Sequence, residues 1–90
     1  MQTKPVLNDP AMVAKIVELD SGWASDADIA WNAAEDKDSY ADRSRVKICL
    51  GDLYRAGLLK RMYIRHRDQP LCCYLLEPSV LNDALDEWQR

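Results

Sequence analysis

Residues 42–61 read DRSRVKICLGDLYRAGLLKR, and this stretch decides the fold. Its apolar residues recur at the spacing of one helical face, which predicts a helix over residues 42–56 that is capped by Asp42 or Ser39. The stripe consists of Val46, Cys49, Leu50, Leu53 and Ala56. Gly57 follows the stripe, where glycine commonly ends a helix, and we place it at the C′ position.

Beyond Gly57 the periodicity changes from helical to two, which predicts a two-stranded β-hairpin over about residues 59–76. Residues 66–70, HRDQP, form its turn, and Leu71–Leu76 form its second strand. We expect the inward side chains to be Leu58, Met62 and Ile64. We expect the outward side chains to be Arg61, Tyr63 and Arg65.

Three further helices are expected around this unit. The first opens at Pro10 after Asn8 or Asp9 and ends near Leu19 or Asp20, since proline is tolerated at the first helical position. The second is capped by Ser25 and runs from Asp26 to about Ala34. The last, about residues 79–89, is capped by Ser79.

The segments between and before these helices complete the prediction. Residues 1–9 are expected to form a flexible arm, and Trp23-Ala24 a short extended piece. Trp23 and Trp31 are expected in the core. Ninety residues suit one domain. The expected fold class is therefore α+β, mainly α, with residues 10–90 as a single domain.

Charge is distributed unevenly along the chain, although the net charge is only −3. Eight basic residues and a single acid lie between Arg43 and Arg67, a formal +7, so the remaining residues carry −10. A basic segment on an acidic body is the pattern expected of a nucleic-acid-binding surface.

The face of the 42–56 helix opposite its apolar stripe carries small, apolar and basic residues. Advancing about 100° per residue from Val46 places Ser44, Ile48, Gly51 and Arg55 there, flanked by Arg45 and Lys47. A major groove admits a helix of this kind, with Arg45 bonding guanine and Ile48 touching a thymine methyl. Gly51 lowers helix stability, and close approach to another molecule is one reason to keep it.

A cationic helix, the Gly57-Leu58-Leu59 sequence and a basic hairpin together resemble the winged helix-turn-helix family of small DNA-binding regulators. The resemblance implies three helices, a hairpin wing and an additional C-terminal helix, and it implies sequence-specific regulation of transcription, for example as a repressor. It also places Arg43, Ser44, Arg45, Lys47 and Ile48 at base-contact positions. Arg65, His66 and Arg67 fall at the wing, and Lys60 and Arg61 are expected to follow the DNA backbone.

An alternative is a winged-helix protein-interaction module or inhibitor. Its acidic surface, chiefly the loop over residues 35–42, would dock a basic partner. The chain is expected to form a homodimer, with the interface left open between the first and the last helix. The apolar stripe of the last helix consists of Val80, Leu81, Ala84, Leu85 and Trp88.

Other functions are disfavoured by the sequence. There is one histidine and no nucleophile or phosphate-loop motif, so an enzyme is not expected, and neither is a cofactor. Adjacent Cys72 and Cys73 would point to opposite faces of a strand, which favours buried thiols over a metal or redox sensor that uses them with Cys49 and His66. The longest apolar run, Leu71–Leu76, is too short to span a membrane, the N-terminus lacks a secretory pattern, and a cytoplasmic location is expected.

Overall fold

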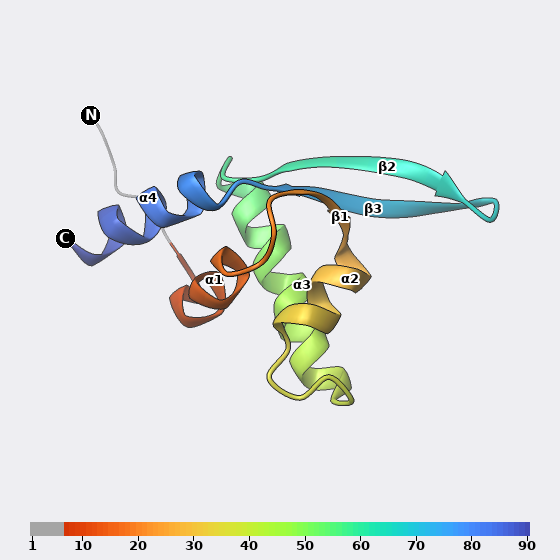
Figure 1. Ribbon diagram of the computed structural model, residues 1–90, viewed down its shortest axis with the longest axis horizontal. Coiled ribbons are helices and arrows are strands. Elements are labelled where there is room, and N and C mark those ends of the chain that lie inside the picture. The colour runs from red at the N-terminus through yellow and green to blue at the C-terminus, as the bar shows by residue number, and fades with distance from the viewer. Residues whose placement is uncertain (1–6) are drawn as a thin grey trace.

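The structure of the protein is a computed structural model, which describes residues 7–90 (Figure 1). This part of the chain forms four helices and a three-stranded antiparallel sheet, an α+β fold. The elements in order are α1 (Pro10–Val17), β1 (Gly22–Ser25), α2 (Asp26–Ala33), α3 (Tyr40–Arg55), β2 (Lys60–His66), β3 (Gln69–Leu76) and α4 (Pro78–Gln89). The order of helices and hairpin agrees with the prediction.

The sheet has one strand more than predicted. Its strand order is β1-β3-β2, so the short segment around Trp23 pairs with the second strand of the hairpin. Trp23 lies opposite Leu75, and Ala24 lies opposite Tyr74. A four-residue strand has too little local pattern to be recognised from sequence, and only its pairing with a partner some fifty residues away makes it a strand.

The predicted facing of the strand over residues 60–66 is wrong by one residue, although Leu58, just before it, packs against the core as expected. Met62 pairs with Cys73, whereas Arg61 pairs with Tyr74. Of the two β3 residues, Tyr74 is the one that belongs to the main core. Paired residues share a face of an antiparallel sheet. Met62 and Ile64 therefore lie on the face away from the core, and Arg61 and Tyr63 lie on the face toward the helices. Apolar residues occur on both faces of this hairpin, so alternation alone could not choose between them.

Helices α1, α2 and α3 lie on one side of the sheet, and α4 continues beyond its end (Figure 1). Val46 and Leu50 of α3 are completely buried where these elements meet, and Tyr74 and Leu76 of β3 close the core from the sheet. Trp23 and Trp31 were expected in this core, but both are about half exposed. The stripe of α4 is buried at Leu81 and Ala84, and α4 packs against α1.

Side-chain caps fix where the helices begin. Asp9, Ser25 and Ser39 each accept a hydrogen bond from a backbone N–H in the first turn of α1, α2 and α3. Ser39, one of the two expected caps, starts α3 at Tyr40, two residues before residue 42. Ser79 does not cap α4, since Pro78 occupies its first position and Glu77 makes no side-chain cap.

The N-terminal arm is shorter than predicted within the described residues. Leu7 is only 6% exposed and belongs to the core, and Asn8 and Asp9 bond to α3. The rest of the predicted arm, residues 1–6, lies outside the described residues. The packed domain therefore begins by Leu7 rather than at Pro10.

Gly57 ends α3 as predicted, at the C′ position. Its φ is +79°, its N–H donates to the carbonyl of Tyr54 (3.0 Å), and the N–H of Leu58 donates to that of Leu53 (2.9 Å). This pair of bonds is the Schellman motif, which turns the chain out of α3 and into β2. At the other end of β2, Arg67 (φ 52°) and Asp68 (φ 60°) form a two-residue hairpin turn.

None of the helices in residues 7–90 is long and apolar enough to cross a bilayer.

We expect Gly57→Ala to lower the free energy of unfolding by about 1 kcal/mol, because the left-handed backbone disfavours a Cβ atom. Nothing lies within 4 Å of that Cβ, so the loss comes from the backbone alone. Gly51→Ala is the matched control. It lies inside α3 and should raise stability by up to about 1 kcal/mol. Urea unfolding measures both free energies of unfolding. If both substitutions changed the free energy of unfolding in the same direction by the same amount, this account would be contradicted.

Candidate functional site

One face of α3 remains open to solvent after the fold is assembled. The start of α1 lies on one side of the helix, α2 and residues 34–39 lie on the other, and the sheet meets its C-terminal end (Figure 1). Between them project Ser44, Lys47, Ile48 and Gly51, which we call the open face. Ile48 is 65% exposed, an unusual exposure for a branched apolar side chain. The sequence placed Ser44, Ile48 and Gly51 on the side opposite the buried stripe and Lys47 beside them, which agrees with the buried positions of α3.

Gly51 leaves the helix backbone uncovered at the centre of the open face, because it has no side chain. A Cβ atom built on it would meet only the flexible end of Arg55, at 3.5 Å, and nothing of the protein core. Internal packing therefore does not demand a glycine here. Close approach of another molecule to the helix backbone would explain it.

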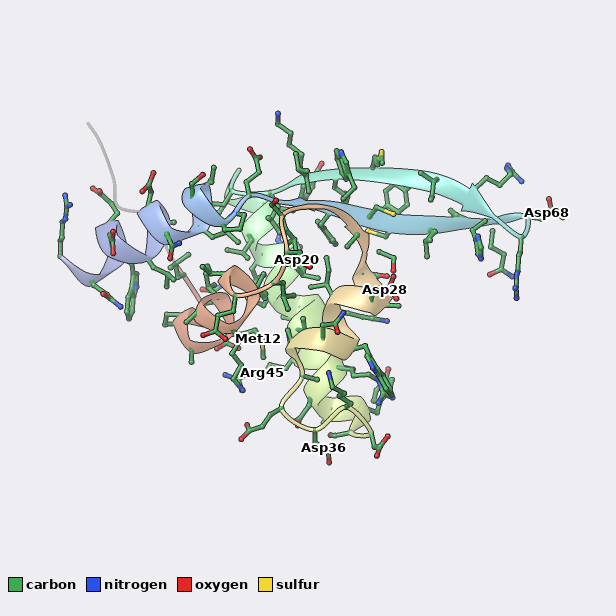
Figure 2. The ribbon with its side chains drawn as sticks, viewed as in Figure 1. Met12, Asp20, Asp28, Asp36, Arg45 and Asp68 are labelled. Atoms are coloured by element: carbon green, nitrogen blue, oxygen red, sulfur yellow. The ribbon has the colours of Figure 1, made fainter. Side chains whose placement is uncertain are left out.

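Arg45, at the edge of the open face, is held by the N-terminal segment. Its guanidinium donates two hydrogen bonds to the carboxylate of Asp9, at 2.7 and 2.8 Å. Figure 2 places Arg45 on the side of α3 that faces α1. The bonds hold the pKa of Asp9 below its usual value, chiefly through the Arg45 hydrogen bond. Sequence reasoning found Asp9 as a cap but missed this role, since no local signal joins residues 36 positions apart.

Asp52 forms a second acidic contact on the same edge. Its carboxylate accepts a hydrogen bond from the side-chain amide of Asn8 (3.1 Å) and forms an ion pair with Arg55. These two contacts lower the pKa of Asp52. Between the N-terminal segment and α3 lies a shallow cavity of about 470 Å³. Its lining includes Ser44 and Ile48 of the open face. Two of the predicted DNA-contacting arginines, Arg45 and Arg55, are thus already paired with carboxylates.

Carboxylates in the acidic segment over residues 35–42 accept hydrogen bonds from backbone N–H groups of the same segment. Asp42 accepts a hydrogen bond from the N–H of Asp36 (2.9 Å), and Asp36 in turn accepts one from the N–H of Asp38 (3.0 Å). Arg43 donates to the carbonyl of Lys37, so this arginine braces the loop. Glu35 lies 3.8 Å from Lys15. Most of the carboxylates of this loop therefore have partners within the molecule.

Arg61 is held by aromatic rings rather than by an acid. Its guanidinium lies 3.8 Å from the centre of the Tyr54 ring and 5.4 Å from that of Tyr63. A hydrogen bond with Tyr74 is the main cause that raises the pKa of Arg61. This cluster joins the end of α3 to the hairpin. The sequence identified Arg61 as a backbone contact and did not predict its aromatic neighbours.

The hairpin carries basic side chains at its base, at Lys60, and near its far end, at Arg65, His66 and Arg67. Lys60, Arg65, His66 and Arg67 are exposed, and within residues 7–90 no carboxylate forms an ion pair with any of them. The hairpin projects away from the helical body, and Asp68 labels its far end in Figure 2.

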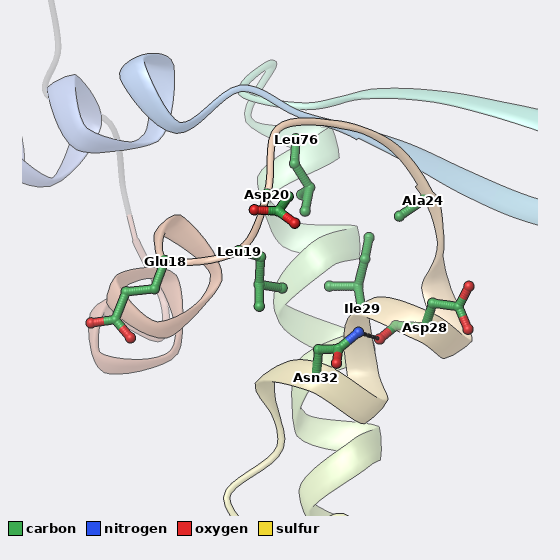
Figure 3. A pocket seen from close by; sticks show the side chains of 8 residues that line it. All are labelled: Glu18, Leu19, Asp20, Ala24, Asp28, Ile29, Asn32 and Leu76. Carbon is green, nitrogen blue, oxygen red and sulfur yellow. Dashed lines mark hydrogen bonds between the residues drawn. The ribbon is translucent and has the colours of Figure 1, made fainter.

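Cys49, Cys72 and Cys73 are free thiols, and two of them are buried. Burial raises the pKa of Cys49 to about 12, so its thiol stays protonated. The described residues contain no group of side chains arranged to hold a metal ion. A cavity of about 300 Å³ beneath β1 has an apolar floor and an acidic rim that includes Asp20 and Asp28 (Figure 3).

Comparison with protein-family models, with curated proteins and with solved structures finds no match to this chain. The function must therefore be argued from the residues and their geometry.

The Asp9–Arg45 pair predicts an acid-dependent contribution to stability. Because the pKa of folded Asp9 lies below its unfolded value, about 3.9, the contribution is complete above that value and is lost as pH falls through the folded pKa. Arg45→Met should therefore be less stable than the parent at pH 7, and the difference should shrink toward pH 2. Urea unfolding at a series of pH values measures this.

Lys47→Met is the control, since Lys47 pairs with no carboxylate of the described chain. If both variants respond to pH alike, the Asp9–Arg45 pair contributes nothing in solution.

Proposed function

We propose that this chain is a double-stranded DNA-binding transcription regulator of winged helix-turn-helix type, with α3 in the major groove and the β2–β3 hairpin on the adjacent backbone. The proposal rests on the open face of α3. Four neighbouring residues there present a hydroxyl, an ammonium group, an exposed apolar side chain and, at the glycine, bare backbone. A helix that reads base edges in a groove needs this mixture of hydrogen-bond donors and a group that contacts a methyl, on a surface whose backbone can approach the bases closely.

The topology supports the winged-helix part of the proposal. A short strand between the first two helices pairs with the far strand of the hairpin, and α2 and α3 are joined by a six-residue connection, residues 34–39. This arrangement presents α3 and the hairpin as neighbouring projections from one core, joined through the Arg61 aromatic cluster. A helix and a hairpin held together in this way suit a groove and its flanking phosphates.

The ion pairs divide the predicted contacts into two groups. Within residues 7–90 no ion pair or side-chain hydrogen bond engages Lys47 or Ser44, so these two and Ile48 act as the primary base-reading residues. Arg45 and Arg55 must leave their carboxylates before they reach DNA, so they contribute less. Arg43 and Arg61 serve mainly to hold the loop and the hairpin.

A protein-interaction module remains the alternative, with the acidic remainder of the chain as its docking surface. The loop over residues 35–42 gives it little support, because Asp36 and Asp42 accept hydrogen bonds from the loop and Glu35 pairs with Lys15. The acid-rimmed cavity in Figure 3 is the observation that keeps it open. A stoichiometric protein partner recovered after nuclease treatment would favour this alternative.

Selection from a random pool of duplexes, at two salt concentrations, tests the main proposal. We expect an enriched sequence and an affinity that falls steeply with salt, because phosphate contacts release counterions. Lys47→Ala should reduce the preference for the enriched sequence by roughly tenfold, and Arg65→Ala should weaken all duplexes alike and lower the salt slope by about 1. No enriched sequence, together with affinity unaffected by either change, would overturn the proposal.

Gly51→Ala separates binding from folding. The variant should fold more stably, as argued above, yet bind the selected duplex at least several-fold more weakly, because its methyl group fills the space for close backbone approach. Ala41→Gly is a useful comparison, since it lowers helix stability at the exposed start of α3 and adds no bulk. Fluorescence anisotropy with the selected duplex gives both affinities. Unchanged affinity of Gly51→Ala would mean that the helix is not read at this point.

A further inference from the structure

One arginine beside the open face of α3 already binds an anionic group of the protein itself. Arg45 donates from Nε and from a terminal nitrogen to the two oxygens of the Asp9 carboxylate, at 2.7 and 2.8 Å. A guanidinium binds a phosphate group through the same kind of paired hydrogen bonds. The Asp9 carboxylate therefore occupies on Arg45 the place that a backbone phosphate of bound DNA would take.

The short segment that carries Asp9 is fixed on both sides. Leu7, before it, is buried in the core. The carbonyl of Asp9 accepts the first hydrogen bonds of α1, from the N–H groups of Met12 (3.1 Å) and Val13 (3.0 Å). The backbone beside α3 is thus held in place. The Arg45 side chain is 45% exposed, so it is the member of the pair that can turn away.

Asp9 keeps a partner when Arg45 leaves it. Its Oδ1 also accepts a hydrogen bond from the backbone N–H of Met12 (3.2 Å), as the N-cap of α1. A carboxylate at the N-terminus of a helix is stabilised by the helix dipole as well. Release of Arg45 therefore leaves no buried charge without a partner, and the arginine can exchange one anion for another.

The Asp9–Arg45 pair lies where DNA is expected to pass. Both residues line the shallow cavity between the N-terminal segment and α3, together with Ser44 and Ile48 of the open face. A duplex whose bases contact Ser44 and Ile48 brings its phosphates close to this cavity. Those phosphates attract Arg45 and repel Asp9, so both effects favour separation of the pair.

We propose that Asp9 is an autoinhibitory latch on α3, which holds Arg45 in the free protein and yields it to a phosphate of bound DNA. The inference rests on the proposed function and adds to it a contact that limits affinity. The two states differ in the position of one side chain. Because every duplex carries phosphates, the latch lowers the affinity for all sequences alike.

Asp9→Asn tests the latch, because asparagine caps a helix about as well as aspartate but carries no charge. The variant should bind the selected duplex roughly two- to fivefold more tightly than the parent chain, which is what an exposed ion pair can withhold. Affinity for unrelated duplexes should rise by the same factor, and the salt slope should increase by about 1. Fluorescence anisotropy measures these affinities.

Asp20→Asn is the matched control for net charge. It removes the same charge from an exposed side chain that lines the cavity beneath β1. Figure 2 shows Asp20 close to the sheet and Arg45 farther along α3, on the side toward α1. The control should raise the affinity much less than Asp9→Asn does. An equal rise would overturn the latch, since net charge alone would then explain the effect.

Arg45→Met separates release of the arginine from removal of a repelling carboxylate. In the Arg45→Met background, Asp9→Asn should give a much smaller gain in affinity, because no arginine is left to release. An equal gain in both backgrounds would overturn the latch. Circular dichroism and urea unfolding confirm that each variant is folded.

The same titrations distinguish failure of the latch from failure of the proposed function. If the parent chain binds the duplex as tightly as Asp9→Asn does, the latch is wrong and the proposed function stands. If neither the parent chain nor Asp9→Asn binds any duplex, both are wrong.

Discussion

Burial of one stripe of α3 is the constraint on which the rest of the structure depends. Val46 and Leu50 are completely buried, and each such side chain stabilises the fold by about 1.5–3 kcal/mol. That stripe fixes the rotation of the helix about its axis. Because the rotation is fixed, the residues on the opposite side have no choice but to face solvent. The candidate site is therefore a consequence of the core.

The end of α3 transmits this constraint to the hairpin. Gly57 turns the chain by a left-handed residue, and the Arg61 guanidinium packs on Tyr54. The first feature sets the direction of β2, and the second ties β2 to the helix that precedes it. Helix and hairpin are consequently held to each other at this point of the structure.

Electrostatics then select among the basic residues. Segment 43–67 has a formal charge of +7, but the fold pairs Arg45 and Arg55 with carboxylates and uses Arg43 and Arg61 for internal contacts. Exposed pairs of this kind are weak and can exchange one partner for another. Among the partners that the structure describes, none pairs with the positive charge at Lys47, at Lys60 and at the far end of the hairpin.

What the sequence determined is the local structure. Helical periodicity located α3 and its open face, Ser25 and Gly57 marked helix ends, and the change to period two located the hairpin, because each of these signals acts between near neighbours. The tertiary structure alone decided the third strand, the facing of Met62 and Arg61, and the Asp9–Arg45 pair. Each of these depends on residues distant in the chain, and a hairpin with apolar side chains on both faces acquires an inside only when the helices pack against it.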